Sequence, residues 1–130
     1  MAVRVAAALD EVATATGVTA PVLIGKSLGS LAAPLAADRG LAAVWFTPLL
    51  TDERTLAALR RASAPCLLVG GTADKRWWDG AAARSVTPHV VEIDGADHAM
   101  FVPGPVSASA AVLGRVMDAV EAFLDGVIGP

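Results

Sequence analysis

Ser27 lies at the centre of a G-x-S-x-G pattern formed by residues 25–29. A serine hydroxyl is a weak nucleophile unless a base accepts its proton and a third group orients that base. The chain offers both partners downstream: a Gly-Gly-Thr-Ala-Asp stretch ends at Asp74, and a Gly-Ala-Asp-His stretch ends at His98. The three side chains together predict nucleophilic attack on a carbonyl carbon.

The residues around Ser27 predict a sharp turn from a strand into a helix. An apolar run, residues 20–24, precedes the pattern and a helical pattern follows it. Gly25 and Gly29 are small, which leaves room for a tight backbone turn on both sides of the serine. The backbone N–H of Leu28 would then lie at the start of the helix, where it is available to stabilise an oxyanion.

The same segment contains Gly25-Lys26-Ser27, which also ends the phosphate-binding pattern G-x-x-x-x-G-K-S. That pattern needs a glycine at position 20, where this chain has Ala20. The intervening residues 21–24 are apolar strand material with no loop to wrap a phosphate. The sequence therefore favours the nucleophile over the phosphate loop.

Four short apolar runs predict strands, at residues 20–24, 42–46, 66–69 and 89–93. The first three are almost continuously apolar, which is typical of parallel strands covered on both faces. Helical patterns separate the runs, so we expect an α/β domain with a parallel sheet of about four strands. The helices are indicated by Val5, Leu9 and Val12 ahead of Gly17, by Leu28, Leu31 and Leu35 with a kink at Pro34, by Leu56 and Leu59, and by Val112, Val116, Val120, Phe123 and Val127.

Ser27, Asp74 and His98 each follow one of these strands. Since the carboxyl ends of parallel strands meet at one edge of a sheet, we expect the three side chains to lie together there. Asp97 is a competing carboxylate, but as the sequence neighbour of His98 it would point away from the ring. Asp79 and Asp94 are weaker alternatives.

On these three stretches, residues 18–124 resemble the α/β-hydrolase superfamily, and most closely its lidless esterases and dienelactone-hydrolase-like members. The resemblance implies Ser27 as nucleophile, His98 as general base and acid, Asp74 as the orienting carboxylate, and the Leu28 N–H as one oxyanion donor. It implies no metal and no organic cofactor. The expected substrate is a small carboxylic ester or thioester.

The resemblance covers only the C-terminal half of such a hydrolase, because the strands that normally precede the serine turn are missing. The loop that supplies a second oxyanion N–H in this family is missing together with these strands. We expect residues 1–130 to form one domain whose first strand has an exposed edge, which favours a homodimer or another partner that covers it.

The substrate pocket is expected to be open. The interval between Ser27 and Asp74 is filled by predicted helix, strand and helix, which leaves no room for a lid. Lys26, Trp77, Trp78 and Met100 are the candidate substrate-binding residues, although the two indoles could equally close the surface beside a solvated charge run.

The composition of this 130-residue chain bears on its binding partners and on its cellular compartment. Its net charge is −3, with no excess of basic residues, which disfavours nucleic-acid binding. The single cysteine, Cys66, lies in an apolar run, which favours a reducing compartment, the cytoplasm by default. The apolar stretch near the N-terminus is too short for a signal peptide or membrane span.

Two functions from different classes remain open at this stage. The first is a serine hydrolase that forms an acyl-enzyme on Ser27. The second is an interaction or scaffold module that keeps the three residues and pairs through its exposed strand edge. Acyl transfer to an acceptor other than water would use the same residues as hydrolysis.

Overall fold

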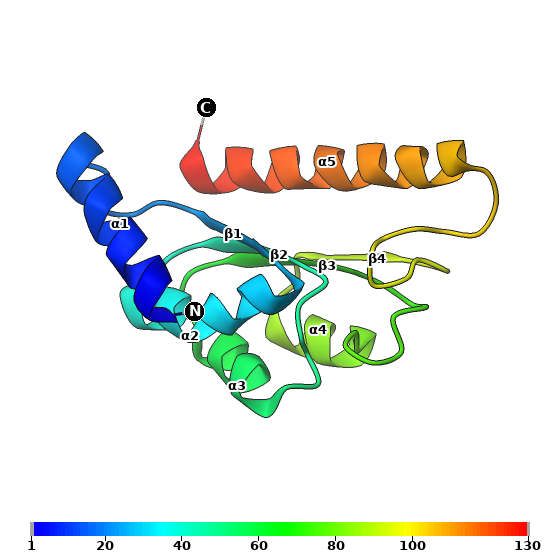
Figure 1. Cartoon of the computed structure of the whole chain (residues 1–130), viewed down its shortest axis with the longest axis horizontal. Coiled ribbons are helices and arrows are strands. Elements are labelled where there is room, and N and C mark those ends of the chain that lie inside the picture. The colour runs from blue at the N-terminus through cyan, green and yellow to red at the C-terminus, as the bar shows by residue number, and fades with distance from the viewer. Residues whose placement is uncertain (1, 130) are drawn as a thin grey trace.

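The computed structural model describes residues 2–129 and contains one sheet with flanking helices (Figure 1). In chain order the elements are α1 (Ala2–Thr16), β1 (Leu23–Lys26), the 3-10 helix η1 (Ser27–Ala32), α2 (Ala33–Arg39), β2 (Ala43–Phe46), α3 (Glu53–Arg61), β3 (Cys66–Gly71), α4 (Gly80–Val86), β4 (Val90–Ile93) and α5 (Val106–Ile128).

All four strands are parallel, and their order in the sheet is β1-β2-β3-β4. The predicted α/β fold with four parallel strands is therefore confirmed. The first strand begins at Leu23 and ends at Lys26, whereas residues 20–24 were predicted. It pairs with β2 over this length, with Leu23 opposite Ala43 and Lys26 opposite Phe46. Ser27 consequently follows β1 directly.

Two apolar clusters, one on each face of the sheet, make up the core. Helices α2, α3 and α4 lie on one face and α5 lies on the other (Figure 1). Neighbouring residues of a strand point to opposite faces, so Trp45 joins the first cluster while Val44 joins the second. Leu68 and Leu67 divide in the same way. This double burial explains why the strands read as continuous apolar runs.

Strand β1 is an edge strand, hydrogen-bonded within residues 2–129 to β2 alone. Helix α5 packs against β3 and β4 on its face of the sheet. It does not cover β1 on that face. Ile24 on that face is 59% exposed, and Lys26 beside it is also exposed. The first strand of the sheet thus presents both a free edge and a partly open face.

The segment after Ser27 differs from the single kinked helix that the spacing predicted. Residues 27–32 form η1, and α2 then begins at Ala33 with Pro34 in its first turn. A proline there has no hydrogen bond to lose, because the N–H groups of a first turn have no acceptor within the helix. Pro34 therefore helps to begin a helix rather than kinking one.

The predicted opening helix is present and ends where expected. Helix α1 stops at Thr16, and Gly17 follows it with a φ of 75°. Helix α4, which begins after Asp79, was not predicted from the sequence. The Asp79 carboxylate accepts a hydrogen bond from the Ala82 N–H and so caps this helix. Across residues 2–129, no helix has the length and apolar character needed to cross a membrane.

Candidate active site

Ser27 occupies a strained turn between β1 and η1. Its φ is 52°, in the left-handed region that non-glycine residues rarely adopt. Gly25 is required by packing, because a Cβ atom there would lie 2.6 Å from the Trp45 ring. Gly29 is different, since a Cβ atom there would meet open space. Gly25 thus makes room for the Trp45 ring, whereas packing does not require a glycine at position 29.

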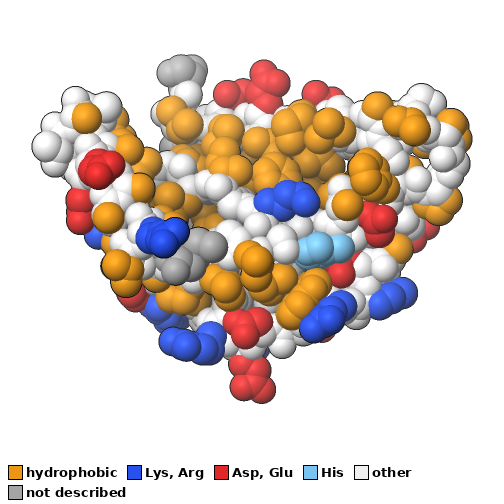
Figure 2. Space-filling view, viewed as in Figure 1, with side chains coloured by type: hydrophobic (Ala, Val, Ile, Leu, Met, Phe, Trp, Pro, Cys, Tyr) orange, Lys and Arg blue, Asp and Glu red, His pale blue; other side chains and the backbone are white. Residues whose placement is uncertain are grey.

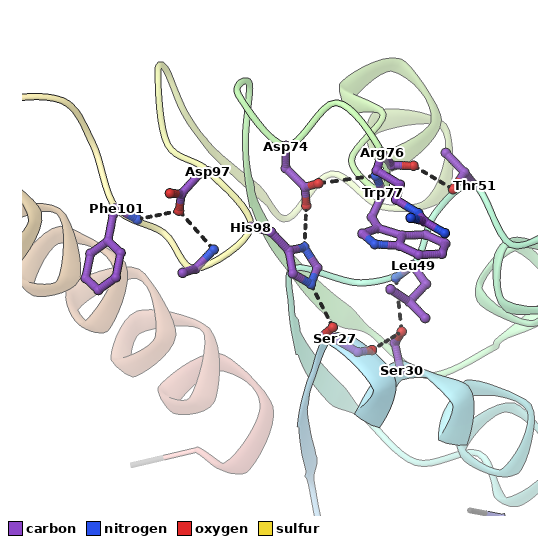
Figure 3. A network of polar contacts seen from close by, with 11 residues as sticks. Ser27, Ser30, Leu49, Thr51, Asp74, Arg76, Trp77, Asp97, His98 and Phe101 are labelled. Atoms are coloured by element: carbon purple, nitrogen blue, oxygen red, sulfur yellow. Dashed lines mark hydrogen bonds and ion pairs between the residues drawn. The ribbon is translucent and has the colours of Figure 1, made fainter.

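Ser30 stabilises this turn through two hydrogen bonds of its hydroxyl group, which the sequence did not predict. Its hydroxyl donates to the carbonyl oxygen of Ser27 over 2.7 Å and accepts from the Leu49 N–H over 3.0 Å. Ser30 is fully buried. The only sequence signal was a small polar residue three positions after Ser27. The two bonds tie the turn to the loop that follows β2 (Figure 3).

The structure brings Ser27, His98 and Asp74 into one line of hydrogen bonds (Figure 3). His98 Nε2 lies 2.7 Å from Ser27 Oγ, and His98 Nδ1 lies 2.6 Å from Asp74 Oδ2. A carboxylate can only accept, so it favours the tautomer with the proton on Nδ1. The Nε2 lone pair then faces the serine hydroxyl. This arrangement can take a proton from Ser27.

Asp74 is shielded from water while His98 is reachable. The side chain of Asp74 is 3% exposed and that of His98 is 35% exposed. The second carboxylate oxygen of Asp74 accepts from the Trp77 N–H over 3.2 Å. Asp74 is therefore held from two sides, and the ring of His98 stands between a buried carboxylate and the surface.

The other carboxylates near His98 have structural partners of their own. Asp97 accepts from the backbone N–H groups of Ala99 and Phe101, each over 2.9 Å, and so shapes the loop that carries His98 (Figure 3). Asp94 accepts from the Thr72 hydroxyl. With Asp79 capping α4, Asp74 is the carboxylate that meets the His98 ring within residues 2–129.

The two tryptophans after Asp74 have separate environments. Trp78 is only 8% exposed, and its indole N–H donates to Glu92 over 2.8 Å. It packs in the core beside Gly70, where a Cβ atom would overlap its ring. Trp78, a candidate substrate-binding residue, is therefore part of the hydrophobic core. Trp77 is partly exposed, and the Arg76 guanidinium lies 4.8 Å from its ring centre.

Lys26 and Met100, two of the candidate substrate-binding residues, line the same apolar cavity beside the serine turn. Met100 adopts a φ of 67° in the loop after His98. Leu28 follows Ser27 in the first turn of η1, where backbone N–H groups have no acceptor within the helix. Its N–H is thus free of an acceptor within η1 and lies beside Ser27.

The parallel sheet and its flanking helices form an α/β-hydrolase-like fold. The structure is similar to that of an alpha-beta serine hydrolase homologue from Coxiella burnetii, with a TM-score of 0.62 and 23% sequence identity. The match covers 72% of this chain and 48% of that one, so this chain spans about half the length of its structural neighbour. No protein-family model and no curated protein matches the sequence.

Proposed function

We propose that this chain is a serine hydrolase that cleaves carboxylic esters or thioesters through an acyl-enzyme on Ser27. The observation that carries the proposal is the line of two hydrogen bonds, 2.7 Å and 2.6 Å long, from Ser27 through His98 to Asp74. Its position at the carboxyl ends of parallel strands supports the proposal, because sites in open α/β sheets form there.

In the first half of the reaction Ser27 Oγ forms a bond to the carbonyl carbon of the ester while its proton moves to His98 Nε2. Asp74 stabilises the imidazolium that results. The carbonyl oxygen becomes an oxyanion, and the Leu28 N–H donates to it. When the carbon–oxygen bond to the alcohol breaks, His98 returns the proton to the departing alcohol, and the acyl group remains on Ser27.

Water completes the cycle. His98 Nε2 accepts a proton from water as its oxygen bonds to the acyl carbon, and the bond to Ser27 Oγ then breaks. The proton returns to Ser27, and a carboxylic acid leaves. A thioester follows the same steps with a thiol as the first product.

Labelling with a fluorophosphonate, which reacts with activated serines, tests the proposal. We expect one adduct, located on Ser27 by peptide mass spectrometry, and turnover of p-nitrophenyl acetate by the same preparation. Ser27→Ala should lose both without losing its circular dichroism spectrum, because only the attacking hydroxyl is removed. Ser107→Ala, an exposed serine on α5, is the matched control and should retain both.

A folded protein that gave neither an adduct nor turnover would overturn the hydrolase and favour the interaction module. If turnover occurs, adding a primary alcohol separates hydrolysis from acyl transfer. Carboxylic acid as the main product supports the hydrolase, whereas a new ester as the main product would make the chain an acyltransferase.

A further inference from the structure

An apolar cavity of about 460 Å³ opens between the loop after His98, the first half of α5 and the ends of β1 and β2. Hydrophobic side chains gather around a hollow in this face of the molecule (Figure 2). Its walls include Phe46, Met100, Val112, Val116 and Met117. This volume lies within the range of about 300–1,000 Å³ that is typical of small-molecule pockets.

Two residues of the cavity wall are chain neighbours of the proposed catalytic residues. Lys26, on one wall, is bonded directly to Ser27, and Ala99, on another wall, is bonded directly to His98. An acyl group attached to Ser27 would therefore have apolar surface beside it. Lys26 supplies the one charged side chain of the wall, and no carboxylate pairs with it inside the described range 2–129.

A second cavity of about 460 Å³ gives a comparison within the same molecule. It lies under the other half of α5 and is lined by Pro65, Pro88 and His89, at the starts of β3 and β4. The amino ends of parallel strands face away from Ser27, Asp74 and His98. The two cavities have the same volume, but only the cavity lined by Lys26 lies near Ser27.

We propose that the cavity next to Ser27 binds the acyl chain of the substrate, and that the substrates are esters or thioesters of aliphatic acids longer than acetate. The inference rests on the proposed function and adds the class of acid. The occupant is an aliphatic chain because the walls are almost entirely hydrocarbon, and burying a methylene group stabilises a complex by about 0.8 kcal/mol, which corresponds to about a fourfold gain in binding.

Hydrolysis of p-nitrophenyl acetate, butyrate, hexanoate and octanoate tests this proposal. We expect kcat/KM to rise by about two- to fourfold for each methylene that the cavity can hold. Ala110→Trp places an indole in the cavity from an exposed position on α5. It should lower the ratio of kcat/KM for octanoate to that for acetate by about tenfold or more.

Ala122→Trp is the matched control, because Ala122 is an exposed alanine on the same helix that lines the other cavity. Its octanoate-to-acetate ratio should equal that of the unmodified chain. Leu113→Glu, at another exposed position of the cavity wall, tests the inference without added bulk. The added carboxylate should lower the same ratio, since it loses hydration when a hydrocarbon chain lies beside it.

The outcomes separate the acyl pocket from the hydrolase itself. Turnover of acetate and labelling of Ser27 without any preference for longer chains would leave the hydrolase standing and overturn the pocket. So would equal ratios for Ala110→Trp and Ala122→Trp. If Ala110→Trp instead changed only the sedimentation coefficient, the cavity would be a contact surface between polypeptides, and the proposal would be wrong.

Discussion

His98 bonds to Asp74, 24 positions earlier in the chain, and not to Asp97, its immediate neighbour. The ring nitrogen Nδ1 lies 2.6 Å from Asp74 Oδ2, whereas the Asp97 carboxylate accepts two N–H groups of its own loop. The two carboxylates therefore have different tasks. Asp74 orients the ring, and Asp97 shapes the loop that presents it.

This division predicts different effects for two conservative substitutions. Asp74→Asn keeps the shape of the side chain but offers an amide where the Nδ1–H needs an acceptor, so the wrong tautomer of His98 is favoured. We expect kcat for p-nitrophenyl acetate to fall by up to about 10⁴-fold. Asp97→Asn retains an oxygen that can accept from the loop, and its kcat should change by less than about tenfold. Steady-state kinetics of both variants would identify Asp97 as the orienting group if the order were reversed.

Replacing Ser30 is expected to lower the stability of the folded protein. Ser30→Ala leaves the buried Leu49 N–H without its acceptor and removes the hydroxyl that donates to the Ser27 carbonyl. We expect the free energy of unfolding to fall by about 1–3 kcal/mol, measured by urea denaturation. Ser107→Ala, on the exposed side of α5, should change it by less than about 0.5 kcal/mol. Equal values for the two variants would show that the bonds below the turn contribute nothing.

Cys66 is expected to be inert in the folded protein. Burial raises the pKa of its thiol to about 11 from an ordinary value near 9, against a smaller lowering by a hydrogen bond with Thr87. The thiolate is the reactive form, so the aromatic disulfide DTNB should leave Cys66 unmodified at pH 8 and react with it rapidly in urea. Rapid modification of the folded chain would contradict this placement.

The same shift predicts a loss of stability at alkaline pH. The folded thiol keeps its proton between about pH 9 and 11, while the unfolded thiol loses it. The folded state then binds more protons, so stability falls as pH rises through this window. Denaturant titrations at pH 8 and pH 10.5 should show a larger fall for the unmodified chain than for Cys66→Ala. A difference in the opposite direction would mean that the folded thiol ionises first.

The free edge of β1 predicts self-association, and we propose that a second copy covers it. The Leu23 N–H donates to the carbonyl oxygen of Ala42, which directly precedes β2. N–H groups alternate in direction along a strand, so the Ile24 N–H points toward the open edge. Analytical ultracentrifugation at micromolar concentration should show a dimer or larger species. Ile24→Lys should shift it toward monomer, because an edge lysine opposes pairing.

Ile128→Lys is the control for that experiment, since Ile128 is also an exposed isoleucine but lies at the end of α5. It should sediment like the unmodified chain. A stable, soluble monomer of the unmodified chain would contradict the pairing of copies, and it would show that an unpaired β1 edge is tolerated in water.

Local patterns predicted the elements well, because each depends on residues close together in the chain. Val44 and Trp45 are both apolar since a central strand is buried on both faces, and that constraint is visible in sequence. Gly17 marks the end of α1 through its own backbone freedom. The predicted positions of Ser27, Asp74 and His98 after strands follow from the same local signals.

Contacts between distant segments were decided only by the tertiary structure. The sequence contains Trp77 and Trp78 side by side, yet Trp78 enters the core against Gly70 while Trp77 stays near the surface. Ser30 contacts the loop after β2 through its hydrogen bond with the Leu49 N–H, and only the folded structure shows this contact. The sequence by itself determined which residues could react and which elements carry them, because hydrophobic period and turn chemistry are local. The distances between those residues and the shape of the cavity beside Ser27 were set by packing, which brings together side chains far apart in the chain.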